Sequence, residues 1–91
     1  MWFVYILKCS DGTFYTGITK DIKRRVQEHN SSVLGAKYTR GRRPVKLVYV
    51  IRKKNKSLAA TQEYLIKKMS KKDKKILTYP HIHSPGIKDS F

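Results

Sequence analysis

The sequence is short of acidic residues, cysteine and long apolar runs, and each shortage excludes a class of protein. Six Asp plus Glu stand against 21 Lys plus Arg in 91 residues, which gives a formal net charge of +15. Asp11 and Asp21 have turn and capping positions, Asp73 lies among lysines and Asp89 in the tail. Only Glu28 and Glu63 remain, so a site with several acidic metal ligands is not expected. The single cysteine, Cys9, cannot form an internal disulfide and is expected to be a small buried strand residue. A reducing, cytoplasmic location is therefore predicted.

The apolar stretches are too short for a membrane protein. Residues 1–7 form the opening uncharged run, which Lys8 closes, and they carry neither the basic region nor the cleavage site of a signal peptide. No segment combines a basic face with exposed Trp, Phe and Leu, as membrane-surface helices do. An excess of positive charge this large costs self-repulsion unless a polyanion offsets it. The predicted partner is therefore nucleic acid rather than a membrane.

The hydrophobic pattern predicts one α+β domain over residues 1–78, in the order β-β-α-β-α-α. The length allows one modest core, and 40% hydrophobic residues are ordinary for a folded chain. Strands are predicted over 2–9, 13–18 and 45–51, and the first is apolar on both faces, as a central strand is. Residues 30–44 are predicted to be a loop, because Gly35, Gly41 and Pro44 punctuate them. Residues 79–91 are predicted to be a loosely attached tail.

Caps and periodicity predict three helices. Asp21 can cap a helix over 22–29, whose apolar stripe is Ile22, Val26 and His29 with Arg25 at its edge. A second helix is expected to begin at Ser57 as cap and end near Met69; its core stripe would be Leu58, Leu65 and Met69, with Ala59 and Ile66 beside it. A short third helix would follow Ser70 and end near Leu77.

The turn between the first two strands leaves two registers open. With a two-residue Asp11-Gly12 loop, Tyr5 and Tyr15 would point to opposite faces of the sheet. With a three-residue loop and Gly12 in the left-handed conformation, Leu7 would pair with Tyr15 and both tyrosines would share a face. The residues by themselves permit either register.

Hydrolysis of a phosphodiester needs a base for water, a cation on the phosphate and usually a metal held by carboxylate. Each residue that could serve also has an ordinary structural explanation. Tyr5 and Tyr15 lie in strands, where tyrosine is commonly a core residue, and His29 on an apolar stripe is commonly a buried, hydrogen-bonded histidine. Arg25 could be a snorkelling or ion-paired side chain. Glu63, at the flank of the second helix, has a favourable spacing for a surface pair with the lysine four residues on.

Residues 37–43 interleave an aromatic ring and a hydroxyl with four cations on a predicted loop. Such a segment suits a clamp on a nucleic-acid backbone, because arginine binds phosphate through paired hydrogen bonds. A solvated basic loop is the alternative interpretation. The candidate contacts are Lys37, Tyr38, Arg40, Arg42 and Arg43. In the tail, His81 and His83 are too few ligands for a zinc site.

Four stretches of the chain, in this order and spacing, resemble the GIY-YIG nuclease domain from Phe3 to about Leu77. They are VYILKCSDGTFYTGIT, DIKRRVQEHN, GAKYTRGRRPVKLVYV and SLAATQEYLIKKMS. The chain is most similar to small stand-alone members related to the excision-repair nucleases. The resemblance implies a three-stranded antiparallel sheet flanked by helices. It also implies metal-dependent cleavage of nucleic acid, with DNA favoured over RNA and DNA repair as the setting.

The resemblance also implies a role for each site residue. Tyr15 would activate water, with Tyr5 and His29 as further proton-handling groups. Arg25 would hold the phosphate, and Glu63 would be the single protein ligand of Mg²⁺ or Mn²⁺. Both tyrosines must then share a face, which selects the three-residue hairpin loop.

Gly17 matches the glycine that lets backbone approach the site. The sequence departs from the family pattern at three positions. Phe3 stands where the first motif has glycine, and Thr16 replaces the isoleucine of the second motif. Ile18 occupies a position where the excision-repair nucleases carry lysine, which removes one cation near the site.

Two other functions remain open. One is a nucleic-acid-binding module without catalytic activity. The other is a basic accessory protein that docks on a ribonucleoprotein or an acidic partner, with residues 40–43 as the contact. Loss of cleavage with retained binding in a Glu63 variant would distinguish the enzyme from the binding module, and stoichiometric co-purification with one protein after nuclease treatment would favour the accessory protein.

Overall fold

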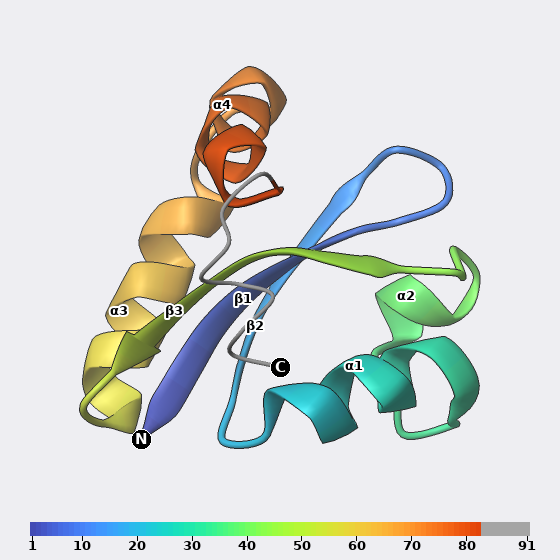
Figure 1. Cartoon of the computed structure of the whole chain (residues 1–91), viewed down its shortest axis with the longest axis horizontal. Coiled ribbons are helices and arrows are strands. Elements are labelled where there is room, and N and C mark those ends of the chain that lie inside the picture. The colour runs from blue at the N-terminus through green and yellow to red at the C-terminus, as the bar shows by residue number, and fades with distance from the viewer. Residues whose placement is uncertain (83–91) are drawn as a thin grey trace.

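A three-stranded antiparallel sheet, with strand order β2-β1-β3, forms the middle layer of the molecule (Figure 1). The computed structural model describes the backbone of residues 1–82 and side chains through residue 78. The strands are β1 (Trp2–Lys8), β2 (Phe14–Thr19) and β3 (Lys46–Lys53). β1 lies in the centre because its residues are apolar on both faces: Val4 and Ile6 are buried on one side, Tyr5 and Leu7 on the other.

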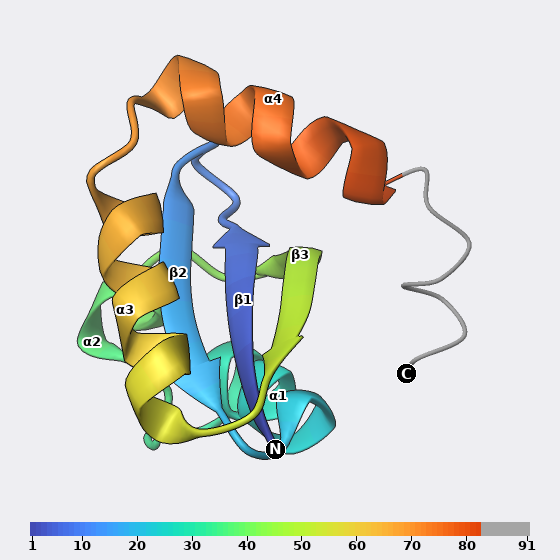
Figure 2. The same cartoon turned by 90° about the vertical axis from the view of Figure 1, so that its left-hand side faces the viewer.

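Four helices cover the two faces of the sheet. They are α1 (Ile22–Ser31), α2 (Lys37–Arg40), α3 (Lys56–Lys67) and α4 (Lys71–Ile82). α3 and α4 lie on one side of the sheet, and α1 and α2 lie on the other (Figures 1 and 2). Each side has its own hydrophobic core, one around Val4, Ile6 and Ile66, the other around Tyr5, Leu7 and Ile22. The predicted α+β class and the three-stranded antiparallel sheet are confirmed.

The β1–β2 hairpin has the register in which both tyrosines share a face. Leu7 pairs with Tyr15, and Gly12 adopts a left-handed conformation with φ of 83°. The Cys9 N–H donates to the Thr13 carbonyl at 2.8 Å, which closes the three-residue loop. A residue other than glycine would be strained at this φ. The three-residue loop is therefore confirmed.

The stripe predicted for the α3 helix is wrong at Leu58 and Leu65, whereas its third member, Met69, does pack against the core. Leu58 and Leu65 are 48% and 53% exposed, whereas Ala59 and Ile66 are almost fully buried. The buried face therefore runs through Ala59, Glu63 and Ile66. It is rotated about the helix axis by one residue, about 100°, from the predicted face. The small Ala59 side chain lets this face approach the sheet closely, so it is chosen over the bulkier leucines.

Three boundaries also differ from the prediction. α3 is capped by Asn55, whose side chain accepts from the Leu58 N–H at 2.9 Å, so Ser57 lies inside the helix. Residues 37–40 form the short helix α2 rather than a loop, because its residue Thr39 is fully buried. α4 continues to Ile82 instead of ending near Leu77, with Thr78 buried as an anchor. The start of the predicted tail is thus helical, and residues 83–91, including His83, lie outside the described residues.

None of the helices within residues 1–82 has both the length and the apolar composition that crossing a membrane requires.

Candidate active site

Three aromatic side chains from three different elements meet on the α1 side of the sheet. Tyr5 comes from β1, Tyr15 from β2, and His29 from the buried face of α1. The His29 ring centroid lies 5.1 Å from that of Tyr15 and 5.9 Å from that of Tyr5. The two tyrosine rings are 6.4 Å apart. The structure therefore brings together three of the residues that the sequence singles out.

A chain of hydrogen bonds runs from Tyr5 through His29 to Thr39. The Tyr5 hydroxyl lies 2.9 Å from His29 Nε2, and His29 Nδ1 lies 2.8 Å from Thr39 Oγ1. Thr39 donates its own proton to the Ala36 carbonyl at 2.9 Å, so its oxygen accepts from Nδ1–H. The Ala36 N–H also points at Nδ1, at 3.4 Å, and would need Nδ1 to accept. The Thr39 contact is the shorter of the two, so it favours the tautomer with the proton on Nδ1, in which Nε2 accepts from Tyr5 and the Ala36 N–H makes no bond to the ring.

Burial fixes the protonation states of this pair at neutral pH. Burial, followed by the positive charge of Arg25, lowers the pKa of His29 to about 4, so the imidazole is neutral. Burial, followed by the neighbouring Tyr15, raises the pKa of Tyr5 to about 12. Tyr5 is therefore a phenol that donates to a neutral histidine, and it is not a base itself.

Gly17 gives Tyr5 the space to lie against the edge strand. A Cβ atom at position 17 would lie 2.6 Å from the Tyr5 hydroxyl oxygen and 2.7 Å from Cζ. Contacts this short are not tolerated between packed side chains. In this structure Gly17 thus accommodates the Tyr5 ring, which then extends across β2 to reach His29.

Arg25 contacts the same cluster but is already partly bound. Its Nη1 donates to Glu28 Oε1 at 2.8 Å and to the Leu34 carbonyl at 2.7 Å. Burial lowers the pKa of Arg25, but hydrogen bonds to Glu28 and Tyr5 raise it overall, so the side chain stays charged. One quarter of the side chain is exposed. Because guanidinium has five N–H donors, donors remain for an incoming anion.

Glu63 lies in α3, on the opposite side of the sheet from α1. It is partly buried on the sheet-facing side of α3, and its negative charge makes the smallest contribution to the raised pKa of Tyr5. Its Oε2 also lies 3.4 Å from Lys67 Nζ, the pair expected from the helical spacing. Its side chain is 22% exposed, so a ligand can reach it.

The donor set fits a hard cation held by one protein ligand. Asp11 and Glu28 are paired with arginines, Asp21 caps α1 and Asp73 lies in α4; Glu63, itself paired with Lys67, is the carboxylate whose charge affects the pKa of Tyr5. Among the side chains that the structure describes, those of residues 1–78, no group of three or more His, Cys, Asp or Glu could enclose a metal. Magnesium commonly keeps several waters and takes one or two protein carboxylates, so a single Glu63 ligand is compatible with it.

The basic segment 37–43 is packed against the site and is not a flexible loop. Tyr38 stacks on Tyr15 with ring centroids 6.0 Å apart, and the Arg42 guanidinium lies 4.0 Å from the Tyr38 ring centroid. Arg42 also pairs with Asp11 in the hairpin loop at 3.0 Å. The guanidinium of Arg43 donates to three backbone carbonyls at the end of α1, those of Glu28, His29 and Ser32.

Of the five residues in this segment that could contact nucleic acid, two are exposed cations without an internal partner among the described residues. Lys37 and Arg40 are exposed on α2, whereas Arg42 and Arg43 are held in internal contacts. Thr39, which orients His29, is the residue that sequence reasoning missed. It lies in a basic run with the appearance of a surface segment, so no local signal marked it.

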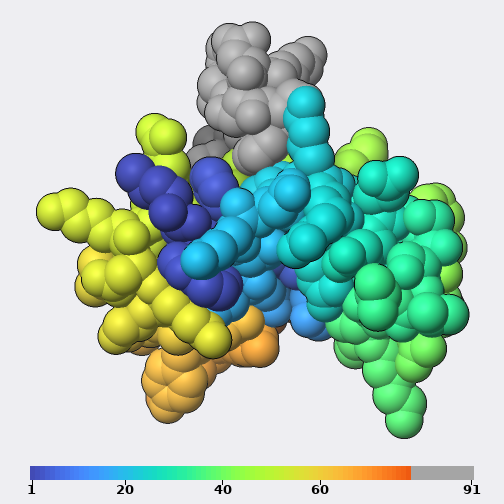
Figure 3. All heavy atoms as spheres, turned by 90° about the horizontal axis from the view of Figure 1, so that it is seen from below, coloured from blue at the N-terminus to red at the C-terminus, as the bar shows by residue number. Residues whose placement is uncertain are grey.

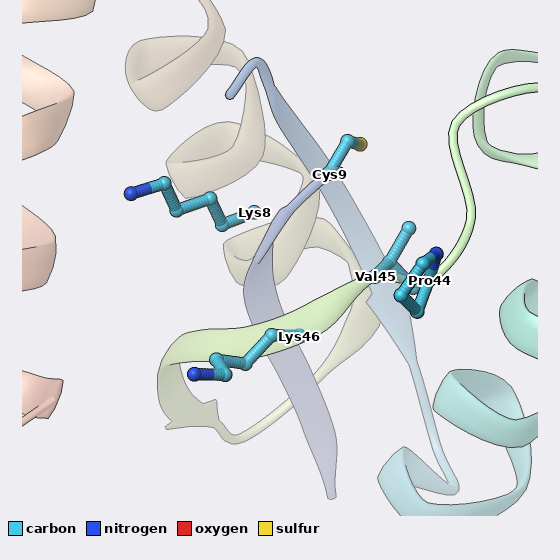
Figure 4. Close-up of a pocket in the computed structure, with 5 residues that line it drawn as sticks. All are labelled: Lys8, Cys9, Pro44, Val45 and Lys46. Atoms are coloured by element: carbon cyan, nitrogen blue, oxygen red, sulfur yellow. The ribbon is translucent and has the colours of Figure 1, made fainter. Parts of the chain in front are cut away.

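A hollow of about 460 Å³ lies where β1 ends, at Lys8 and Cys9. Its lining residues are Lys8, Cys9, Pro44, Val45 and Lys46. Lys8 and Lys46 point away from Cys9 and Pro44 (Figure 4). Burial raises the pKa of the Cys9 thiol, which makes it a poor nucleophile. Tyr5, Tyr15, Arg25 and His29 are not among the described residues that line this hollow, so it is separate from the site.

Comparisons with known proteins identify the family of this chain. The family described as the GIY-YIG catalytic domain matches residues 1–76. A UPF0213 protein of Desulfotalea psychrophila is 57% identical over 76 residues, which cover 84% of this chain and 69% of that protein. One from Halobacterium salinarum is 52% identical over 77 residues, covering 85% and 99%. The solution NMR structure of a UPF0213 protein from Bacillus halodurans has a TM-score of 0.56 at 42% identity, with 90% of this chain and 92% of that chain covered.

Proposed function

Because this chain belongs to the GIY-YIG catalytic domain family, we propose that it is a metal-dependent endonuclease that hydrolyses phosphodiester bonds in DNA. The observation that carries the proposal is the convergence of Tyr5, Tyr15 and His29 beside Arg25 on one face of the sheet. A base, a hydrogen-bonded partner and a cation within one cluster are the groups that this hydrolysis requires. The net charge of +15 supports nucleic acid as the substrate.

Tyr15 would be the residue that activates water. It is half-buried, its ring lies tilted against that of His29 and stacked on that of Tyr38, and its hydroxyl has no hydrogen-bond partner among the described residues. Tyr5 would orient the same water. Since the Tyr5 proton is donated to His29, its oxygen can only accept a hydrogen bond, which is what an attacking water offers.

Arg25 would bind the phosphate through the guanidinium donors that Glu28 and Leu34 leave unused. Glu63 would hold a divalent cation, Mg²⁺ or Mn²⁺, which when bound would stabilise negative charge on the phosphate. Lys67 would have to release Glu63 for this to happen, and an exposed ion pair of this kind is weak enough to exchange. Lys37 and Arg40 would contact the flanking backbone.

Cleavage of labelled single-stranded, duplex and branched DNA, and of RNA, with and without Mg²⁺ tests the proposal. The variants are Tyr15→Phe and Glu63→Gln, each with a matched control elsewhere on the surface, Tyr64→Phe and Asp73→Asn. We expect metal-dependent cleavage of DNA by the wild type and by both controls, and its loss in both site variants.

Each other result has a defined meaning. Binding without cleavage of any substrate would replace the enzyme with the binding module. Cleavage that survives in Tyr15→Phe and Glu63→Gln would contradict the assigned roles. Stable co-purification with a protein after nuclease treatment, without binding to nucleic acid, would favour the accessory protein.

A further inference from the structure

A second cavity adjoins the candidate active site where β1 begins and β2 leads into α1. Its volume is about 420 Å³, within the range of roughly 300–1,000 Å³ typical of small-ligand sites. Trp2 of β1, Ile18 of β2 and Lys20 after it form one part of the wall, and Arg24 and Arg25 of α1 form another. Figure 3 looks onto this end of the molecule. There the N-terminal residues (dark blue) lie between the start of α3 (yellow) and the β2–α1 region (cyan).

The cavity combines an aromatic ring with cations. The Lys20 and Lys56 ammonium groups lie 5.5 and 5.4 Å from the centroid of the Trp2 ring. Trp2 is half-buried, so part of its surface remains accessible. Three cations line the wall against one carboxylate, that of Glu28, which is shared between Arg24 at 3.8 Å and Arg25 at 2.8 Å. The surroundings therefore favour a planar ligand that carries negative charge.

Arg25 joins this cavity to the active site. Its guanidinium lies beside Tyr5 and Glu28, and the same residue lines the cavity. A strand whose phosphate is bound by Arg25 would therefore have its next nucleotide at the cavity mouth. The other cations of the wall, Lys20 and Arg24, are exposed and could meet the following phosphate.

We propose that this cavity binds the nucleotide adjacent to the scissile phosphate: Lys20 leaves the Trp2 ring, the base stacks in its place, and the phosphate lies between Lys20 and Arg24. The proposal rests on the proposed function, and it specifies the substrate. A base inside a duplex is already stacked between its neighbours and has no free face for Trp2. The preferred substrate is therefore DNA with an unpaired nucleotide beside the cleaved bond, as in single strands, flaps or junctions.

Trp2 is the single tryptophan of the chain, so its fluorescence reports on this cavity directly. The titration uses the full chain without divalent metal, so that no cleavage occurs, and three probes: a short single-stranded oligodeoxynucleotide, a blunt duplex, and an abasic strand with the same number of phosphates. We expect saturable quenching by the single strand and little change with the duplex or the abasic strand. Binding of each probe is measured in parallel by the anisotropy of a labelled end.

Variants separate the cavity from general basic charge. Loss of one stacked base or one phosphate contact should weaken single-strand binding by about five- to tenfold. We expect this for Trp2→Leu and for Lys20→Ala, compared with less than about twofold for the matched control Lys72→Ala on α4. Because Trp2→Leu could disturb folding, the exposed Lys20→Ala variant provides an independent test.

Several results would overturn the proposal: binding by anisotropy without a change in Trp2 fluorescence, equal quenching by the abasic strand, or equal loss in Lys20→Ala and Lys72→Ala. Failure of the proposed function gives a different pattern. Quenching by the single strand with no cleavage under any condition would leave the cavity as a nucleotide site on a protein that is not a nuclease.

Discussion

Replacing Gly17 with alanine should distort the active site through a single clash. All three of the nearest atoms to an added Cβ belong to Tyr5, at 2.6, 2.7 and 3.1 Å. The Tyr5 ring would have to move, because the Gly17 backbone is fixed in the β1–β2 ladder. Overpacking of this kind costs about 1–3 kcal/mol. Moving the ring also breaks the bond to fully buried His29, and a buried group left without its partner costs about 1–3 kcal/mol more.

We therefore expect Gly17→Ala to lower the free energy of unfolding by about 2–6 kcal/mol, out of a total of about 5–15 kcal/mol for a domain. Cleavage should fall by about 100-fold or more if folded protein remains, because Tyr5 no longer lies in place. Urea unfolding followed by circular dichroism measures the first quantity. The matched control is Gly41→Ala, where an added Cβ meets nothing within 4 Å and the backbone φ is −89°.

A double-mutant cycle identifies the cause. In a Tyr5→Leu background the ring is gone, so Gly17→Ala should cost about 2 kcal/mol less than it does in the wild type. Equal stability of Gly17→Ala and Gly41→Ala would refute the reasoning. An unchanged cost in the Tyr5→Leu background would show that the strain arises elsewhere.

Three further predictions concern the supports of the site. Arg43→Ala removes the donor to three carbonyls at the end of α1 and should destabilise the fold by about 2–4 kcal/mol, against less than about 0.5 kcal/mol for exposed Arg40→Ala, by urea unfolding. Burial lowers the pKa of His29 from 6.5 to about 4, so between these pH values the unfolded chain binds more protons than the folded protein does. The free energy of unfolding should therefore fall by about 3 kcal/mol as the pH drops from 6.5 to 4. The His29→Gln variant should show a flatter pH dependence. Tyr38→Ala should reduce cleavage by about tenfold while Tyr38→Phe, which keeps the stack on Tyr15, should not; equal activity of the two would contradict a role for the stack.

Local patterns were sufficient for the strands and for α1. β1 is apolar on both faces, and the stripe of Ile22, Val26 and His29 is set by residues within two turns of one helix. The hairpin register was not settled by the residues, since Asp11 and Gly12 suit loops of either length. The family resemblance selected the three-residue loop, and the structure confirms it.

The face of α3 illustrates a limit of helical periodicity. Leu58 and Leu65 form one apolar stripe, and Ala59 and Ile66 form another one step around the helix. Hydrophobicity favours the leucines, but the sheet accepts the face with the smaller residue because the helix can then pack closer. The same rotation turns Glu63 toward the sheet, whereas the sequence placed it only at the flank of the buried face.

By itself the sequence determined the composition of the candidate site, namely Tyr5, Tyr15, Arg25 and His29. It also determined the excess of positive charge that favours a polyanionic partner. Tertiary structure alone decided which of these groups are free to act. Arg43 has the same side chain as Arg40, yet it is held by the carbonyls of α1 while Arg40 faces solvent. Thr39 became the partner of His29 because α2 packs on α1. Contacts between segments distant along the chain set burial, and burial sets the pKa and the hydrogen-bond partners of each group.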